Sequence, residues 1–266
     1  MGELDNDWDV AAAKIDWDPM RPIRYGMAAR YIKDLDKNQE LLEVGCGEGT
    51  GLSIFARMGF TRLTGVEVSA ERLRRAYAKV PSGTLLHEIN PDSALPFNDG
   101  SFGLVISLAV IEHVISPKQY LAEICRVLKP CGTAIISSDC LSWNYMQRLH
   151  LYRSMQPIDW ALEIGTFEKL FDETGFRMQH FDTFNLPGRG CPMYSSIKNI
   201  LGKRLLGRDL NKYLERNDNI NNLDISIQEA LKVSQGKVDN SKFYLFKKRI
   251  RNLIDDENVF FLSKNE

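Results

Sequence analysis

The sequence predicts an α/β fold in which a mostly parallel sheet carries helices on both faces. Short apolar runs alternate with helix-like segments of about ten residues, and this alternation is typical of parallel β-α-β units. A glycine-rich turn at residues 45–49 directly follows the first strand-like run, at the edge of the sheet where α/β proteins bind ligands. Of the 266 residues, 44% are apolar and 26% charged, which is typical of a globular protein with one large domain.

The first half of the chain contains the clearest elements. A helix is predicted from Pro22 to Leu35, where apolar residues recur at helical spacing. Strands are predicted at Leu41–Val44, Leu63–Val68, Leu85–Ile89 and Leu104–Leu108. A helix should follow the glycine turn and end near Gly59, and Ser69 should cap a helix that runs to Lys79.

The second half continues the alternation and then departs from it. The predicted elements are a helix at Pro117–Leu128 stopped by Pro130, a strand at Ala134–Ser138, a helix at Thr166–Thr174 ended by Gly175, and strands at Arg177–Phe184 and Val259–Leu262. Between the last two strands, Leu186–Asn258 shows no clear strand pattern and holds two basic-apolar segments, Ser196–Arg216 and Lys242–Arg251. This region is therefore interpreted as an insertion into the domain.

Charge and cysteine usage exclude several classes of protein. A net charge of −1 argues against a general nucleic-acid binder. Five scattered cysteines without a C-x-x-C pair (Cys46, Cys125, Cys131, Cys140, Cys191) indicate reduced thiols, and no metal site is expected. The acidic start of the chain has no signal-peptide pattern, and no apolar run has the roughly 20 residues that a membrane span needs. We therefore expect a soluble, cytoplasmic protein.

The turn Glu43–Thr50 is the most informative segment. Glycines at alternate positions allow a sharp turn and let a ligand lie against the backbone. A dinucleotide-binding G-x-G-x-x-G pattern that begins at Gly45 needs glycine at position 50, where Thr50 stands. This mismatch disfavours a nicotinamide oxidoreductase. The spacing suits a ligand with an amino-acid tail, whose ammonium Glu43 could orient; the alternative is a tight strand-to-helix turn without a ligand.

Glu43–Gly49 and Gly65–Ser69 resemble the first two motifs of the class I S-adenosylmethionine-dependent methyltransferases. The resemblance is close over about Glu40–Ser138 and looser to Gly175 and at the final strand. It implies a Rossmann-like, doubly wound sheet of seven strands, mostly parallel with an antiparallel last strand. It also implies S-adenosylmethionine as the cofactor.

The resemblance assigns the cofactor contacts residue by residue. Around the glycine turn, the residues expected to hold the methionine part are Glu43, Gly45, Cys46, Gly47 and Gly49. Glu67, followed by Val68, is expected to accept hydrogen bonds from the ribose hydroxyls, because a carboxylate can engage two vicinal hydroxyls at once. The alternative for Glu67 is a solvated acid at a strand end.

Leu95–Phe102 resembles the L-P-F-x-D-x-S-F segment of the family, and an acidic residue upstream of it usually contacts the adenine amine. Pro91 stands at the expected place, so Asp92 is favoured for this contact and Asn90 is second. Two further positions depart from the family pattern. Gly103 replaces an aspartate, which should affect stability more than binding. Cys131 replaces a glycine of the L-K-P-G-G turn, which should be tolerated unless the position requires a positive φ.

His113, after the fourth strand, is the candidate catalytic base, because histidine titrates near neutral pH; the alternative is a histidine that only packs or caps the next helix. Ala109 and Val110 are expected to line the cofactor pocket, although a core would use the same residue types. The aromatic segment Asp139–Trp160 suits an acceptor pocket or a covering helix. It contains Trp143, Tyr145, Tyr152 and a weaker base candidate, His150.

We expect one domain, 1–266, with an N-terminal helical cap at 1–36 and a helical insertion at 186–258 over the acceptor side. If the sixth strand is parallel, that insertion begins at the same edge as the glycine turn. Its basic face (Lys198, Lys203, Arg204, Arg208) would then hold an anionic acceptor, or residues 196–216 would contact a membrane surface peripherally. The alternative is ordinary helix packing.

The predicted function is methyl transfer from S-adenosylmethionine to an oxygen or nitrogen of a small-molecule acceptor, anionic or lipid-linked if the basic face binds it. The alternative is a catalytically silent S-adenosylmethionine-binding or scaffold protein. Acceptor identity and oligomeric state do not follow from the sequence.

Overall fold

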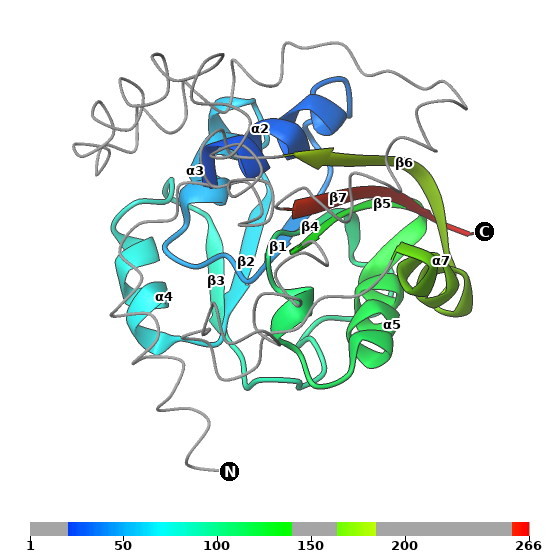
Figure 1. Cartoon of the computed structure of the whole chain (residues 1–266). Helices are drawn as coiled ribbons and strands as arrows, with labels where there is room; N and C mark the ends of the chain where they lie inside the picture. The colour runs from blue at the N-terminus through cyan, green and yellow to red at the C-terminus, as the bar shows by residue number, and fades with distance from the viewer. Residues whose placement is uncertain (1–20, 140–163, 185–256, 266) are drawn as a thin grey trace, which may run out of the picture.

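A computed structural model of the chain describes residues 21–139, 164–184 and 257–265 (Figure 1). Their strands form one seven-stranded sheet in the order β3-β2-β1-β4-β5-β7-β6. The strands are β1 Leu41–Val44, β2 Leu63–Glu67, β3 Leu85–Glu88, β4 Phe102–Ser107, β5 Leu128–Asp139, β6 Phe176–Phe184 and β7 Glu257–Lys264. Pairing is parallel from β3 to β5, whereas β7 runs antiparallel to both β5 and β6. The predicted fold class is confirmed.

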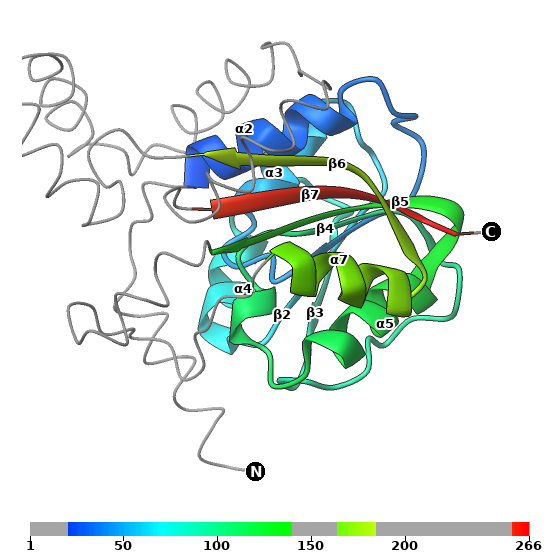
Figure 2. The same cartoon turned by 45° about the vertical axis from the view of Figure 1, so that its right-hand side comes forward.

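Helices cover both faces of the sheet, as Figure 2 shows with α2 and α3 above it and α5 and α7 below. The helices are α2 Arg21–Ile32, α3 Thr50–Arg57, α4 Ala70–Tyr77, α5 Pro117–Val127 and α7 Ile164–Glu173, with a short 3-10 helix, η1, at Ile111–His113. None of these described helices has both the length and the apolar character that a bilayer span requires.

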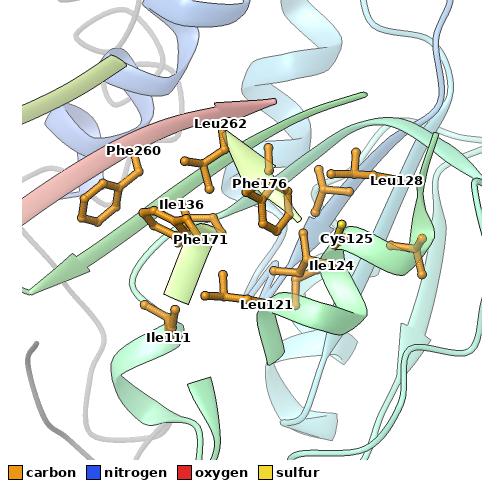
Figure 3. Packing of buried hydrophobic residues seen from close by; sticks show 14 of the residues in the cluster. Ile111, Leu121, Ile124, Cys125, Leu128, Ile136, Phe171, Phe176, Phe260 and Leu262 are labelled. Atoms are coloured by element: carbon orange, nitrogen blue, oxygen red, sulfur yellow. The ribbon is translucent and has the colours of Figure 1, made fainter. Parts of the chain in front are cut away.

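Alternation along β1 divides the core into two layers. Leu41 packs with α2, α3 and α4 in one cluster, whereas Leu42 packs with α5 and α7 in the other. The second cluster is shown in Figure 3, where Phe171 and Phe260 approach one another from α7 and β7. Their ring centroids are 5.0 Å apart, and burying one such ring contributes about 1.5–3 kcal/mol.

Three element boundaries in the second half of the chain differ from the sequence prediction. Helix α5 ends at Val127, and Leu128 already has an extended backbone with ψ of 139°, so Pro130 does not stop the helix. Strand β5 begins at Leu128, six residues earlier than predicted, because the chain pairs with β4 at Leu128, bulges, and pairs again from Thr133. Strand β7 begins at Glu257, so the segment expected at 186–258 ends before that residue.

Local signals that mark helix ends are confirmed. The Ser69 hydroxyl accepts a hydrogen bond from the Arg72 backbone N–H at 3.2 Å and caps α4. Gly175 follows α7 with φ of 85°, a conformation that glycine adopts at little cost.

Gly103 allows the Gln39 side chain to pack closely, because a Cβ at position 103 would lie 3.1 Å from the Gln39 Cβ.

The strand ends fix where the remaining segments attach. Asp139 at the end of β5 pairs with Glu257 at the start of β7, and Glu257 also pairs with Phe184 at the end of β6. The chain therefore leaves the carboxyl edge of the sheet after β5, at residue 140, and again after β6, at residue 185. It returns to the same edge at the start of β7. Residues 140–163 and 185–256 lie outside the described residues, as do residues 1–20.

Candidate functional site

A cavity of about 430 Å³ opens at the carboxyl ends of β1, β2 and β4. Its wall includes Gly45 from the glycine turn, Glu67 and Val68 from the end of β2, and Ala109 and His113 after β4. The loop after β3 and the first turns of α5 close the other side. This volume lies within the ~300–1,000 Å³ range of small-molecule sites.

The glycine turn is sharp, as its sequence predicts, and its three glycines have a left-handed backbone. Gly45, Gly47 and Gly49 have φ of 73°, 53° and 77°. A Cβ at Gly45 would collide with the Val110 side chain, and a Cβ at Gly49 would lie 2.5 Å from Val80 Cγ1. At Gly47, in contrast, a Cβ would meet no protein atom within 4 Å. The turn is therefore tightly packed on both sides of a glycine whose outer face is open to a ligand.

The Glu67 carboxylate joins β2 to the glycine turn. Its Oε2 accepts the Gly47 backbone N–H at 2.8 Å. Its Oε1 accepts the backbone N–H groups of Val68 and Ser69 at 3.0 and 3.1 Å. These bonds orient the buried carboxylate at the cavity wall. A carboxylate offers about four acceptor sites, so one acceptor position remains for a ligand hydroxyl.

A second carboxylate in the turn, which the sequence analysis did not single out, points away from the cavity. Glu48 accepts a hydrogen bond from Arg75 at 3.0 Å and forms an ion pair with Lys79, both from α4 or its end. Ser53 of α3 also donates to the Lys79 carbonyl at 3.1 Å. These contacts hold the turn against α4, and a residue between two glycines carries no local pattern that predicts them.

Two residues of the first motif lie behind the cavity wall. The Glu43 side chain is 1% exposed and accepts a hydrogen bond from the Tyr25 hydroxyl at 2.9 Å. It packs so closely on Gly51 at the start of α3 that no larger residue would fit there. Cys46 is buried in the core, and burial, followed by the charges of Glu43 and Glu67, raises the pKa of its thiol well above its usual value. Neither side chain is part of the described cavity wall.

On the opposite side of the cavity, the structure separates the two candidates after β3. Asp92 lines the cavity, has φ of 55°, and accepts the Ile115 backbone N–H on Oδ1 at 2.8 Å. Asn90 is exposed and is absent from the described wall. Asp92 is therefore the one placed to contact a bound ligand.

Ala109 and His113 continue the wall after β4. Ala109 has φ of 53°, an unusual conformation for a residue with a Cβ, and its N–H donates to the Ser137 hydroxyl at 2.9 Å. His113 ends η1 and lines the cavity while half-buried. Both Ala109 and His113 are therefore part of the same cavity wall.

Helix α5 contributes cavity residues that the sequence analysis missed. Tyr120 lines the cavity and shares a hydrogen bond of 2.5 Å with the Ser107 hydroxyl at the end of β4. Burial raises the pKa of Tyr120. The cavity wall also includes Gln119 and Glu123 of α5 and the N-cap residue Ser116. Their spacing of three to four residues places them on one helix face, which is the signal that could have identified them.

Several predicted acceptor-side residues lie outside the described residues. They are Trp143, Tyr145, His150, Tyr152 and Trp160 after β5, and Lys198, Lys203, Arg204 and Arg208 between β6 and β7.

Comparison with known proteins supports the resemblance seen in the motifs. Residues 42–136 match the family described as "Methyltransferase domain". Over 152 residues the chain is 28% identical to O-methyltransferase resE of Aspergillus sclerotiorum, covering 54% of this chain and 56% of that protein. Over 124 residues it is 32% identical to a ubiquinone biosynthesis O-methyltransferase of Caulobacter sp. (strain K31), covering 44% and 49%. The matches thus span about half the length of these relatives.

Solved structures share the fold at low sequence identity. A chain from the complex between the Haloferax volcanii Trm112 methyltransferase activator and a methyltransferase aligns with a TM-score of 0.63 and 18% identity, covering 99% of this chain and 98% of that one. Haemonchus contortus phosphoethanolamine N-methyltransferase 2 in complex with S-adenosyl-L-methionine aligns with a TM-score of 0.57 and 17% identity, covering 91% and 52%. The methyltransferase domain at residues 42–136, the named relatives and the shared fold are consistent with a class I methyltransferase, and they support S-adenosylmethionine as the cofactor.

Proposed function

We propose that the chain transfers a methyl group from S-adenosylmethionine to an oxygen or nitrogen of a small-molecule acceptor. The observation that carries this proposal is the convergence of Gly45, Glu67 and Asp92 from three strand ends on one cavity. The cofactor supplies a methyl group activated by a sulfonium. The protein's part is to bind and orient the two reactants, since positioning supplies much of the acceleration in such a transfer.

The cavity residues divide by chemistry along an elongated ligand. The backbone of Gly45–Gly49, including Cys46 and Gly47, suits the methionine part, and Glu43 fixes that turn from behind. Glu67, with Val68 beside it, suits one ribose hydroxyl, because one carboxylate acceptor position remains. Asp92 suits the adenine amine, and Ala109 forms the wall between the two ends.

His113 is the proposed base for deprotonating the acceptor. It lines the cavity next to Ala109, close to where the transferred methyl group would lie between the two ends of the cofactor. A histidine at this place can accept a proton near neutral pH. If His113 only packs, its replacement by alanine will leave turnover unchanged.

The acceptor side is proposed from the attachment points of the chain. Segments 140–163 and 185–256 both join the sheet at its carboxyl edge, so residues 186–256 are proposed to recognise the acceptor, with 1–36 as an N-terminal cap. The named relatives that are O-methyltransferases favour an oxygen acceptor. The basic residues of 196–216 favour an anionic acceptor or peripheral membrane contact. Two buried free thiols, Cys46 and Cys125, support a cytoplasmic location.

The test is turnover with the full chain. S-adenosylmethionine is incubated with a panel of phenols, alcohols and amines, each in neutral and anionic form, and release of S-adenosylhomocysteine is measured. We expect release above the acceptor-free rate with at least one oxygen or nitrogen acceptor, and a fall of about a hundredfold in H113A, the scale of general-base catalysis. Tight cofactor binding without turnover on any acceptor would favour the silent binding protein instead.

A charge-neutralised variant tests the proposed role of the segment between β6 and β7 in binding the acceptor. Replacing Lys198, Lys203, Arg204 and Arg208 by glutamine should leave S-adenosylhomocysteine affinity unchanged and impair turnover of an anionic acceptor. The wild-type rate on such an acceptor should also fall with salt, because exposed charges are screened over about 8–10 Å at physiological ionic strength. Full activity of the neutralised protein at low salt would contradict this role for the basic residues.

A further inference from the structure

Glu123 and Arg126 of α5 lie one turn apart and face the loop that follows β3. The Arg126 guanidinium donates to the Leu95 carbonyl at 3.0 Å and to the Phe97 carbonyl at 2.8 Å. Glu123 accepts the Leu95 backbone N–H at 3.0 Å. The pair therefore binds the loop through both its N–H and its carbonyl groups, 28 or more residues away in the chain.

The two side chains are also bound to each other in a fixed geometry. Arg126 donates to Glu123 through Nε and one terminal nitrogen at 3.0 and 2.8 Å, and its other terminal nitrogen also reaches Asp99 at 2.8 Å. A guanidinium has five N–H donors, and these contacts use all five. The bond from Arg126 lowers the pKa of Glu123, and the bonds to Glu123 and Asp99 raise the pKa of Arg126, so both groups stay charged at neutral pH.

The loop that this pair holds is one wall of the cavity. Pro91, Asp92 and Leu95 line the cavity, as does Glu123 itself, whereas Arg126 lies behind the wall. Asp92 is held separately through its Oδ1, which accepts the Ile115 N–H. The Asp92 carboxylate still has a second oxygen to offer a ligand. The position of that oxygen in the cavity depends on where the loop sits.

We infer that Glu123 and Arg126 are positioning residues that set how tightly, and how selectively, the site binds the adenine base. They act by holding the loop 91–97 so that Asp92 faces the base. This inference rests on the proposed function, in which the cavity binds S-adenosylmethionine. Arg126 touches neither the cavity nor the ligand, so its effect must pass through the loop.

The experiment compares two ligands that differ only at the base. S-adenosylhomocysteine carries the adenine amine, and S-inosylhomocysteine carries a carbonyl oxygen in its place. A carboxylate favours the amine and is left unpaired by the oxygen, so the ratio of the two dissociation constants reports on Asp92. Calorimetry on the full chain measures both constants, and thermal melting without ligand shows whether each variant is folded.

The variants are R126Q, R126K and E123Q, with R74Q as the matched control. Arg74 binds Glu71 three residues away through Nε and a terminal nitrogen at 2.9 and 2.8 Å, as Arg126 binds Glu123. Arg74 is exposed on α4, and its guanidinium binds the Glu71 carboxylate of the same helix. R74Q therefore removes an equivalent helical ion pair without touching the loop.

For R126Q we expect S-adenosylhomocysteine to bind about tenfold more weakly, and the base selectivity ratio to fall at least about threefold, the scale of a lost charge-assisted hydrogen bond. R126K should not restore the ratio, because one ammonium cannot reproduce the fork of five donors. E123Q, which keeps an acceptor for Leu95, should lie between R126Q and wild type. R74Q should match wild type.

Each contrary outcome has a separate meaning. A folded R126Q with unchanged affinity and ratio would overturn the inference, as would rescue by R126K or a loss of affinity that leaves the ratio unchanged. If R126Q does not melt cooperatively, R126K and E123Q decide by the same two criteria. Failure of the wild-type protein to bind S-adenosylhomocysteine would overturn the proposed function, and this inference with it.

Discussion

The two edges of the sheet differ in what their unusual residues do. At the carboxyl edge, Gly45 and Ala109 hold a left-handed backbone at the cavity wall, and Glu67 uses its charge to fix the turn. At the amino edge, Glu40 binds Arg62 and Lys129 at 2.7 and 2.6 Å and joins three strand starts. We conclude that changes at the carboxyl edge should mainly alter ligand binding, and changes at the amino edge mainly stability.

The largest effect is expected for Gly47→Val. A side chain at this position would project into the space where the ligand must lie, so we expect S-adenosylhomocysteine to bind at least about a hundredfold more weakly, or about 2.7 kcal/mol. The measurement is calorimetry, with denaturant unfolding of the same sample. Gly83→Val is the matched control, because Gly83 also has a positive φ and no protein atom within 4 Å of an added Cβ, but it lies in the turn before β3 and not in the glycine turn beside Glu67.

Strain alone should cost both variants similar stability, about 1–2 kcal/mol. If Gly47→Val and Gly83→Val reduced the affinity equally, the open face of Gly47 would not be a ligand site.

Glu67→Ala should weaken binding by about 1.5–3 kcal/mol, the scale of hydrogen bonds to a charged group. Part of this loss comes from the glycine turn, because the Gly47 N–H loses its acceptor. Glu67→Gln keeps one acceptor oxygen, so its affinity should lie between wild type and Glu67→Ala. Wild-type affinity in both folded variants would show that the ligand binds elsewhere.

The sequence predicted the seven strands and the glycine turn because their signals are contiguous. The strand and the glycines at positions 45, 47 and 49 lie next to each other in the sequence, so the local pattern alone predicts the turn. In the same way, Ser69 directly precedes the helix that it caps. The opposite wall could not be predicted in the same way. Its shape depends on Arg126 bonds to residues about thirty positions earlier, and no local pattern encodes which carbonyl a guanidinium will reach.

The amino edge shows a similar limit. Cysteine at position 131 was expected to be tolerated unless the position requires a positive φ, and Cys131 has φ of 58°. The bulge that imposes this angle arises from the pairing of β5 with β4, which is a tertiary feature. Gly103 was expected to threaten stability, and the way Gln39 fills the space beside it depends on a side chain 64 positions earlier.

Cys131→Gly should therefore stabilise the protein. Relief of the left-handed strain outweighs the extra entropy of glycine in the unfolded chain, and the expected gain is about 0.5–1 kcal/mol in the free energy of unfolding. Affinity for S-adenosylhomocysteine should stay at the wild-type value. Cys131→Ala keeps the Cβ and serves as the control, and an equal gain in that variant would assign the effect to the thiol instead of the backbone.

The smallest effect is expected at Glu40, whose hydrogen bonds from Lys129, from its own backbone N–H and from Arg62 lower its pKa to about 2. A lowered folded-state pKa gives stability that is present above the unfolded value near 4.5 and is lost as the pH falls through the folded value. Glu40→Gln should cost at most about 1 kcal/mol at pH 7, because the group is partly exposed.

The difference between wild type and Glu40→Gln, measured by urea unfolding, should shrink as the pH falls from 5 towards 2. A difference that stays constant across this range would separate the effect from the carboxylate charge.

The most direct measurement of the central claim is calorimetric titration of the full chain with S-adenosylhomocysteine and, separately, with NAD. Gly45, Glu67 and Asp92 line one cavity, and the turn that begins at Gly45 has three left-handed glycines, but Thr50 stands where a dinucleotide-binding turn needs glycine. We predict one S-adenosylhomocysteine bound per chain with an affinity on the order of micromolar, and no heat of binding for NAD. Binding of NAD without binding of S-adenosylhomocysteine would contradict the account.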